Sequence, residues 1–334
     1  MDELMGMGNY YLGIDMGGTK ILAAVIDQDG RIISRAKKKT RAQRPQQEIL
    51  ERLADVAREA VTEAKMPLEQ IQAVGIGSPG PLDHINGCII ETPNMNLTGA
   101  PIVSYMQDQL KVPVFLDNDV NVGTYGEFRY GAGRGFDDVI GIFIGTGVGG
   151  GLIINGKLLH GLSLNAGELG HMKIVVDGAR CGCGQKGCLE AYASKTAMVN
   201  RLRKAIEGGK KSVIPDIINK DWSKFTSKAF LKAVQKKDKL VLHELEISAR
   251  YTGVAVGSLL NILSPEVVVI GGGLVESLEK LYMPLITKYA KANSFPIMHE
   301  KVKIVPAALG DDAGILGAAA IAMDRLQAGN QKVQ

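Results

Sequence analysis

One histidine and three cysteines stand close together in the sequence, with the residue types and the spacing of metal ligands. His171 is followed after nine residues by Cys181, and then by Cys183 and Cys188, with three glycines between the cysteines. Four nitrogen and sulfur donors suit a closed, tetrahedral zinc site, and glycines permit the sharp reversals that such spacing needs. A closed site is structural, because it leaves no coordination position for a substrate. The alternative is three buried free thiols beside an unrelated histidine.

A glycine-rich turn near the N-terminus could present bare backbone to an anion. It reads Asp15-Met-Gly17-Gly18-Thr19-Lys20 and follows a short apolar run. Two glycines leave the backbone N–H groups uncovered, while Thr19 adds a hydroxyl donor and Lys20 a positive charge. Asp15 could hold Mg²⁺ through water. The alternative is an ordinary hairpin turn.

A second glycine-rich turn, Gly145-Thr146-Gly147, belongs to a string that continues to Gly151. The string contains the pattern G-x-G-x-x-G, but a dinucleotide-binding fingerprint must open a helix. The apolar run 152–154 and an Asn-Gly turn follow instead, so a strand is expected there. We therefore interpret it as a second phosphate-facing turn, which would converge with the first on one triphosphate.

A third glycine run and several carboxylates complete the set of candidate residues. Gly271-Gly272-Gly273 follows a buried strand and would let a flat base approach the backbone, unless it is only a strand-to-helix turn. Glu168 and Glu190 flank the proposed metal ligands and could bind the hydroxyl groups of a sugar. Asn118 and Asp119 stand where a strand leads into a helix, the end of open α/β sheets at which ligands bind. For Asp117 and Asp312 a helix N-cap is the preferred interpretation.

The composition limits the class of protein. The chain has 334 residues, of which 41 are glycine and four are cysteine, with a net charge of +4. Few cysteines argue against a disulfide-framed secreted protein, and the charge is too small to indicate nucleic-acid binding by itself. No signal peptide and no membrane span are expected, so we predict a cytoplasmic protein with a loose tail over residues 1–9. Cys88, alone on an apolar run, is predicted to be a core residue.

The elements that position these residues recur in the same order in both halves of the chain. Each half is predicted to have a strand, a glycine turn, a hairpin, a helix, a strand with a glycine loop, a helix, a strand with an acidic turn and a final helix. This repetition predicts an internal duplication of an α/β unit. The stretch 208–239 is predicted to be an inserted helical subregion or a mobile lid. The strands of the two halves are expected at 10–15, 20–26, 31–36, 71–77 and 112–116, and at 139–144, 151–154, 157–159, 266–270 and 302–306.

These motifs together resemble the ROK sugar kinases of the actin-like ATPase superfamily, over residues 11 to about 322. The resemblance implies an α/β fold of two actin-like, ribonuclease H-like lobes with a deep cleft between them. The small lobe would comprise residues 1–119 and 312–334, and the large lobe, with the zinc clip and the helical insertion, residues 120–311. The motifs are Asp15-x-Gly-Gly-Thr-Lys20, Pro79-Gly-Pro81, Asp117-Asn-Asp119, Gly145 to Gly151, Gly167-Glu-Leu-Gly-His171 and Cys181 to Glu190.

The resemblance also implies a phosphotransferase that uses ATP, Mg²⁺ and structural zinc to phosphorylate a hexose, usually at O6. Asp119 would be the catalytic base toward that hydroxyl. The sugar would be bound by Gly80, Asn118, Asp119, Glu168, His171 and Glu190, with Asn94 a weaker candidate. ATP would be bound by Asp15, Gly17, Gly18, Thr19, Lys20, Gly145, Thr146, Gly147 and Gly272.

Within that family glucose is the first choice of substrate. N-acetylmannosamine, N-acetylglucosamine, fructose and mannose stay open, because an extra acetyl group is accommodated by loop shape that the sequence does not show. Residues 94–101 also lack the tryptophan expected in many glucokinases of this group, which leaves the identity of the hexose open. Polyphosphate is open as an alternative donor, and a homodimer or homotetramer is expected from the resemblance alone. A sugar-responsive transcription regulator is the remote alternative. The 14 residues before Asp15 leave no room for a DNA-binding helix pair, so neither nucleic acid nor membrane is expected as a partner.

Overall fold

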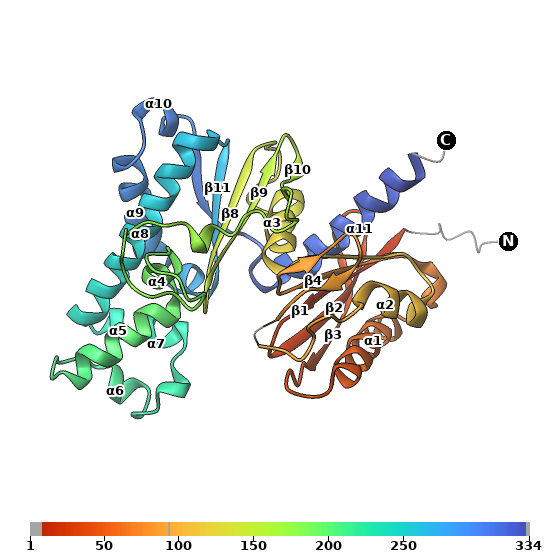
Figure 1. Cartoon of the computed structure of the whole chain (residues 1–334), viewed down its shortest axis with the longest axis horizontal. Helices are drawn as coiled ribbons and strands as arrows, with labels where there is room; N and C mark the ends of the chain where they lie inside the picture. The colour runs from red at the N-terminus through yellow and green to blue at the C-terminus, as the bar shows by residue number, and fades with distance from the viewer. Residues whose placement is uncertain (1–8, 93, 332–334) are drawn as a thin grey trace. The chain divides into compact units, whose positions relative to one another are not determined.

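The computed structural model describes residues 9–92 and 94–331, and the chain forms two compact units (Figure 1). The first unit comprises Met1–Gly135, Leu158–Gly167 and Asp311–Gln334, and the second comprises Phe136–Lys157 and Glu168–Gly310. The chain therefore crosses between the units four times. The lobe boundaries at residues 119 and 312 remain a prediction. The compact units are divided differently, because residues 120–135 and 158–167 group with the first unit.

The two units contain five-stranded sheets with the same strand order. The order is β3-β2-β1-β4-β7 in the first and β10-β9-β8-β11-β12 in the second. In both sheets the first hairpin is antiparallel and the next two strands along the sheet are added in parallel. The predicted repeat is thus confirmed in the topology. The strands are β1 (Tyr10–Met16), β2 (Lys20–Asp27), β3 (Ile32–Lys39), β4 (Ile71–Ser78), β7 (Val114–Asn118), β8 (Val139–Ile144), β9 (Val148–Ile154), β10 (Lys157–Leu158), β11 (Val267–Gly271) and β12 (Lys303–Pro306).

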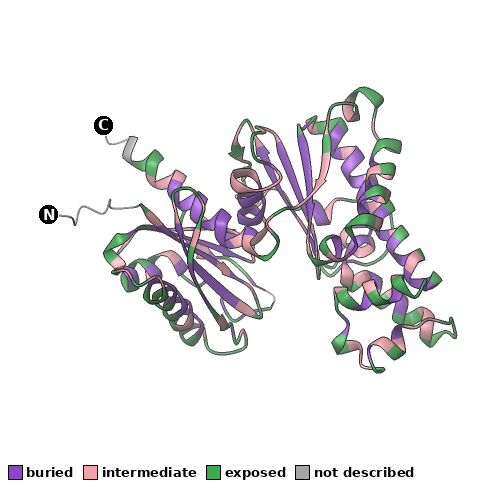
Figure 2. Ribbon diagram, turned by 180° about the vertical axis from the view of Figure 1, so that it is seen from behind, coloured by how far each residue is buried: buried purple, intermediate pink, exposed green. Residues whose placement is uncertain are grey.

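The inner strands of the first sheet are covered on both faces, since their side chains alternate between two helical layers, whereas the edge strand β3 keeps alternate side chains exposed. Leu12 and Ile14 of β1 belong to the apolar core that includes α1 (Gln46–Glu63) and α2 (Ile102–Leu110). Gly13, between them, faces α11 (Ala313–Gln331), which in turn packs against α3 (Asp119–Tyr130). A short helix η1 (Leu68–Gln70) and the hairpin β5 (Leu82–Asp83) and β6 (Cys88–Ile89) complete this part of the chain. Figure 2 shows that the central strands are largely buried while the helices keep exposed outer surfaces.

Glycines on β1 and β4 allow α11 to lie unusually close to the sheet. A Cβ atom on Gly13 would lie 1.9 Å from the carbonyl oxygen of Ile315, and one on Gly75 would lie 1.8 Å from that of Ala318. Such distances are far below van der Waals contact, so no other residue fits without moving the helix. Part of the glycine excess therefore serves helix packing, in addition to the turns.

This packing predicts a clear difference between two glycine variants. Gly75→Ala should lower the free energy of unfolding by about 2–3 kcal/mol, because the new methyl group meets backbone that has no room to yield. Gly18→Ala is the matched control, since a Cβ there has no neighbour within 4 Å. Its effect should stay within about 0.5 kcal/mol. Urea unfolding measures both, and equal midpoints would contradict the packing argument.

In the second unit the long helices α8 (Lys239–Leu263) and α9 (Gly273–Ala292) pack against each other and contribute to one apolar core with the sheet. The predicted insertion at 208–239 is helical. Its residues Ile214 and Phe230 are fully buried in that same core, so the insertion is an integral part of the unit. The remaining elements of this unit are η2 (Leu169–His171), α4 (Glu190–Ala193), α5 (Lys195–Glu207), α6 (Ile214–Ile217), η3 (Trp222–Lys224), α7 (Ser227–Gln235) and α10 (Pro296–His299), and η4 (Gly310–Asp312) leads back to the first unit.

Over the residues described, none of the helices combines the length and the apolar character needed to span a bilayer.

Candidate active site

The turn between β1 and β2 is open on the side where it could meet a ligand. Gly17 N–H donates to the carbonyl of Lys20 at 2.9 Å, which closes the turn, and Thr40 N–H donates to the carbonyl of Thr19 at 3.0 Å. A Cβ on Gly18 would have no neighbour within 4 Å, and one on Gly17 would meet only the Lys20 carbonyl at 3.5 Å. The predicted phosphate turn is therefore held in shape by its own backbone and is not covered by side chains.

Two charged side chains flank this turn. Asp15 lies beside the start of α11, where burial raises the pKa of its carboxyl, opposed by the charge of Lys20 and supported by that of Asp311. Lys20 Nζ lies 3.3 Å from Asp311 Oδ2. Asp312, predicted as a helix cap, pairs with Arg35 at 2.6 Å. A carboxylate oxygen at the end of β1, next to the open turn, suits a hydrated divalent cation.

The junction between β7 and α3 carries the predicted catalytic residue. Asn118 is the N-cap of α3: its Oδ1 accepts from Val120 N–H at 2.8 Å and from Asn121 N–H at 3.3 Å. Asp119 is the first residue of the helix, half-buried, and its Oδ1 accepts from Val120 N–H at 2.9 Å. Gly80 lies next to this junction, since a Cβ there would be 3.6 Å from Asn118 Nδ2. The structure thus brings Gly80, Asn118 and Asp119 together.

Asp117 is not the helix cap that the sequence suggested. Its side chain is almost fully buried, and its Oδ1 accepts from Asn118 N–H at 2.9 Å and from Asn121 Nδ2 at 3.0 Å. Its Oδ2 accepts from Arg325 Nη2 at 2.6 Å and lies 2.8 Å from His160 Nε2. Although burial opposes ionisation, the hydrogen bond from His160 and the charge of Arg325 hold the pKa of Asp117 below its usual range. Cap propensity could not reveal this, because Arg325 is 208 residues away.

In the second unit, the turn between β8 and β9 carries the other predicted phosphate contact. Gly145 N–H donates to the carbonyl of Gly147 at 2.9 Å, and a Cβ on Gly145 would have no neighbour within 4 Å. Thr196 Oγ1 donates to the carbonyl of Thr146 at 2.7 Å, which ties the turn to α5. The strand starts at Val148, earlier than predicted, so the later glycines of this string lie in β9. One of these, Gly150, leaves space for Leu169 of η2.

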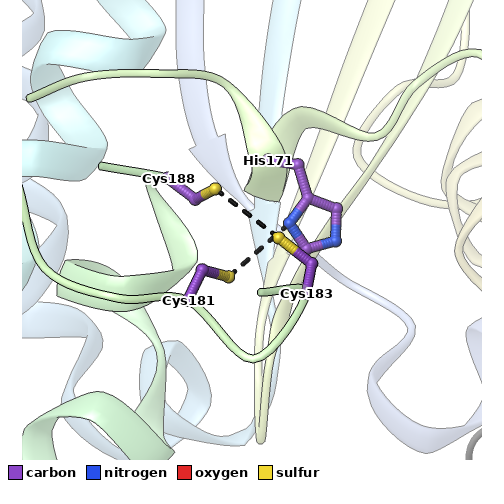
Figure 3. Close-up of side chains that lie close together, drawn as sticks. All are labelled: His171, Cys181, Cys183 and Cys188. Atoms are coloured by element: carbon purple, nitrogen blue, oxygen red, sulfur yellow. Dashed lines mark hydrogen bonds between the residues drawn. The ribbon is translucent and has the colours of Figure 1, made fainter. Parts of the chain in front are cut away.

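The four predicted metal ligands lie together in the second unit (Figure 3). Their ligand atoms are all within 4.8 Å of one another. Cys183 Sγ and Cys188 Sγ are 3.8 Å apart, and Cys181 Sγ is 3.7 Å from His171 Nδ1. With Zn–S bonds of about 2.3 Å, a tetrahedron has sulfur–sulfur edges of about 3.8 Å and sulfur–nitrogen edges of about 3.6 Å. The donor set and both distances therefore fit a Cys₃His zinc site.

The ligands connect the cluster to the predicted sugar-binding carboxylates. His171 turns Nδ1 toward Cys181, while its Nε2 lies 3.9 Å from Glu168 Oε2. Glu190 Oε2 accepts from Val148 N–H at 3.0 Å, and its Oε1 lies 3.4 Å from Cys181 Sγ. The cluster is thus linked through Glu190 to Val148, which follows the second glycine turn, and through His171 Nε2 to Glu168. The sequence did not indicate the outer contact of Lys173, whose Nζ lies 3.1 Å from Cys188 Sγ.

The third glycine run borders a cavity of about 230 Å³ at the carboxyl ends of β11 and β12. Gly272, the predicted ligand contact, has a φ of 100°, and a Cβ on it would lie 2.3 Å from the carbonyl oxygen of Ile144. Gly272 therefore permits close packing on β8, and its neighbour Gly271 lines the cavity. The other lining residues are Ile270, Val275, Glu276, Glu279, Pro306 and Ala307.

The sequence singled out two further residues of the first unit, Asn94 and Cys88. Asn94 is exposed, and its carbonyl accepts a hydrogen bond from Gln43 Nε2 at 3.4 Å. Cys88 is only half-buried in the hairpin of β5 and β6, so its assignment to the core was wrong; its Sγ lies 3.4 Å from the carbonyl oxygen of Asn86. A lone cysteine among apolar residues did not indicate a two-stranded hairpin.

Comparison with known proteins assigns this arrangement to a family. The sequence model of the ROK family matches residues 11–325. The glucokinase of Thermotoga maritima is 33% identical over 94% of this chain and 98% of its own length. The xylose repressor of Bacillus subtilis is 30% identical over 94% of this chain and 77% of its own length. A ROK family glucokinase from Streptomyces griseus, crystallised with glucose and AMPPNP, has 32% identity and a TM-score of 0.79 over 94% of this chain and 99% of its own. Its likeness confirms the α/β fold of actin-like units, and the chain belongs to the ROK family.

Proposed function

We propose that this protein is an ATP-dependent hexose kinase that phosphorylates the 6-hydroxyl of glucose. The observation that carries the proposal is its 32% identity, over 94% of the chain, to a glucokinase that binds glucose and AMPPNP. The residues needed for this chemistry are present: an open phosphate turn in each unit, and a carboxylate at the helix start beside Asn118 and Gly80.

In this proposal Asp119 accepts the proton of the 6-hydroxyl as that oxygen attacks the γ-phosphorus of ATP. A bond forms between O6 and phosphorus, and the bond from phosphorus to the bridging oxygen of ADP breaks. Because phosphoryl transfer depends mostly on positioning and charge neutralisation, the base supplies only part of the acceleration, about 10²- to 10⁴-fold. Asn118 would orient the hydroxyl groups of the sugar through Nδ2, because its Oδ1 already caps α3.

The two glycine turns would offer the phosphates the backbone N–H groups that do not close the turns, because the N–H groups of Gly17 and Gly145 already donate to Lys20 and Gly147. Asp15 would hold Mg²⁺ through water, and the ion would neutralise charge on the transferred phosphoryl group. Lys20 and Thr19 add donors next to the same turn. The cavity bordered by Gly271 would accept the adenine base, whose amino group finds carboxylate acceptors in Glu276 and Glu279.

The zinc cluster has a structural part in this proposal. His171, Cys181, Cys183 and Cys188 would hold the ion, which fixes the orientation of the imidazole and the loop around it. His171 then offers Nε2 to a sugar hydroxyl, next to Glu168, while Glu190 stays anchored to Val148. We place the protein in the cytoplasm and expect a dimer or tetramer in solution.

A panel of sugars tests the proposal directly. ADP release with ATP is measured for glucose, mannose, fructose, N-acetylglucosamine and N-acetylmannosamine, and glucose should give the highest kcat/KM. Polyphosphate replaces ATP in a parallel series and should support less turnover. A purified protein that releases no ADP with any of these sugars would refute the kinase. Sugar-dependent binding to DNA, measured on the same preparation, would then support the regulator.

A further inference from the structure

Four separate parts of the first unit converge on the buried carboxylate of Asp117. The four parts are its own strand β7, α3 with Asn121, α11 with Arg325, and the segment 158–167 with His160. Only 1% of the Asp117 side chain is exposed, and 19% of that of His160. A buried carboxylate needs partners for its charge, and here it has several from distant parts of the sequence.

The segment 158–167, here called the crossing segment, is where the chain leaves the second unit, packs on the first unit and returns. Two side chains fasten it there. Asn165 Oδ1 accepts from Leu82 N–H at 3.1 Å and its Nδ2 donates to the Leu82 carbonyl at 3.3 Å. His160 forms the other attachment, to Asp117. The segment ends at Gly167, one residue before Glu168, which we propose to bind the sugar.

A second imidazole holds the ring of His160 in its orientation. The rings of His84 and His160 are tilted by 36° with centroids 4.1 Å apart. His84 follows β5, the strand to which Asn165 is bonded. Burial, followed by the proximity of His160, lowers the pKa of His84, which favours a neutral ring against its neighbour. The contact therefore fixes the plane in which His160 Nε2 meets Asp117.

Asp117 transmits this attachment to the candidate site. Its Oδ1 holds both the backbone N–H of Asn118 and the amide of Asn121, that is, the two sides of the junction between β7 and α3. Asn118 caps the helix and Asp119 begins it. A shift of the Asp117 carboxylate would therefore displace the side chains that we propose to contact the sugar.

We propose that His160 is a positioning residue for sugar binding. This proposal rests on the kinase function proposed above. His160 holds Asp117, and through it Asn118 and Asp119, on one side, and fixes the crossing segment that leads to Glu168 on the other. No atom of the phosphate turn at Asp15–Lys20 takes part in this network, so ATP binding should not depend on it.

Two substitutions at position 160 separate positioning from folding. His160→Leu removes the nitrogen that meets Asp117. His160→Gln keeps an N–H donor at the same number of bonds from the backbone as Nε2. The matched control is His243→Leu, the loss of a histidine on α8 of the second unit. Initial rates of ADP release are recorded against glucose at saturating ATP, and against ATP at saturating glucose. A KM does not depend on the folded fraction, so partial unfolding alone cannot mimic the effect.

His160→Leu should raise the KM for glucose about tenfold, as expected for a lost hydrogen bond to a charged group. The KM for ATP should stay within about twofold, the glutamine variant should recover most of the glucose affinity, and His243→Leu should match the wild type. Equal glucose KM values for wild type and His160→Leu would overturn the proposal, as would equal rises in both KM values. If the wild type itself releases no ADP, the proposed function fails first.

Discussion

Replacing Asp119 by asparagine is expected to lower kcat about 10²- to 10⁴-fold while glucose and AMPPNP still bind. Asparagine isolates the loss of the base better than alanine does, because its amide oxygen can still accept the hydrogen bond that Val120 N–H donates to Asp119 Oδ1. The start of α3 should therefore survive, and only the capacity to accept a proton is removed. Stopped assays of glucose 6-phosphate formation measure kcat, and calorimetric titrations measure the two affinities.

Asp108→Asn, at an exposed position on α2, is the matched control for the loss of one carboxylate. It should keep wild-type kcat. Turnover of Asp119→Asn close to that of the wild type would reject Asp119 as the base. A loss of glucose binding with unchanged kcat at saturation would instead assign Asp119 to sugar binding alone.

The second large effect is expected at the metal cluster. Cys188→Ser should abolish stoichiometric zinc in the purified protein, because it removes a buried ligand of the set formed with His171, Cys181 and Cys183. Structural zinc contributes on the order of 10 kcal/mol in small domains. The second unit should therefore unfold at a clearly lower temperature, and glucose affinity should fall because His171 loses its fixed orientation. Elemental analysis by mass spectrometry and thermal unfolding measure the two effects.

Cys88→Ser provides the control, since Cys88 lies in the hairpin of β5 and β6 and not in the cluster. This variant should keep its zinc and its unfolding temperature. If zinc-free wild-type protein unfolded at the same temperature as zinc-loaded protein, the proposed structural metal site would be eliminated. Another bound metal in place of zinc would correct its identity while preserving the cluster.

Local sequence patterns predicted the elements well, because turns and strands depend on neighbouring residues. The strand Val139–Ile144 has the predicted bounds, and the turn after Asp15 has the open backbone that two adjacent glycines favour. The cluster of His171 and the cysteines was predictable for the same reason, since all its ligands lie within 18 residues in the sequence.

Contacts between distant segments could not be predicted in this way. Asp117 and Arg325 are 208 residues apart in the sequence, and the residues around each of them do not indicate that the two side chains pair. The glycines of β9 were assigned to a phosphate turn, yet Gly150 makes room for Leu169. A glycine signals only that a side chain is absent. What takes its place is decided by the tertiary structure.

The close approach of α11 to the first sheet has a consequence for how the protein is made. Gly13 and Gly75 belong to strands that are synthesised long before α11, the helix that covers them. Until the ribosome has produced α11, that face of the sheet lacks this cover and stays exposed to solvent. Pairing across such a separation is slow and leaves apolar surface open to aggregation. The second unit lies wholly between these partners in sequence, so it can complete its core while the first unit still lacks α11.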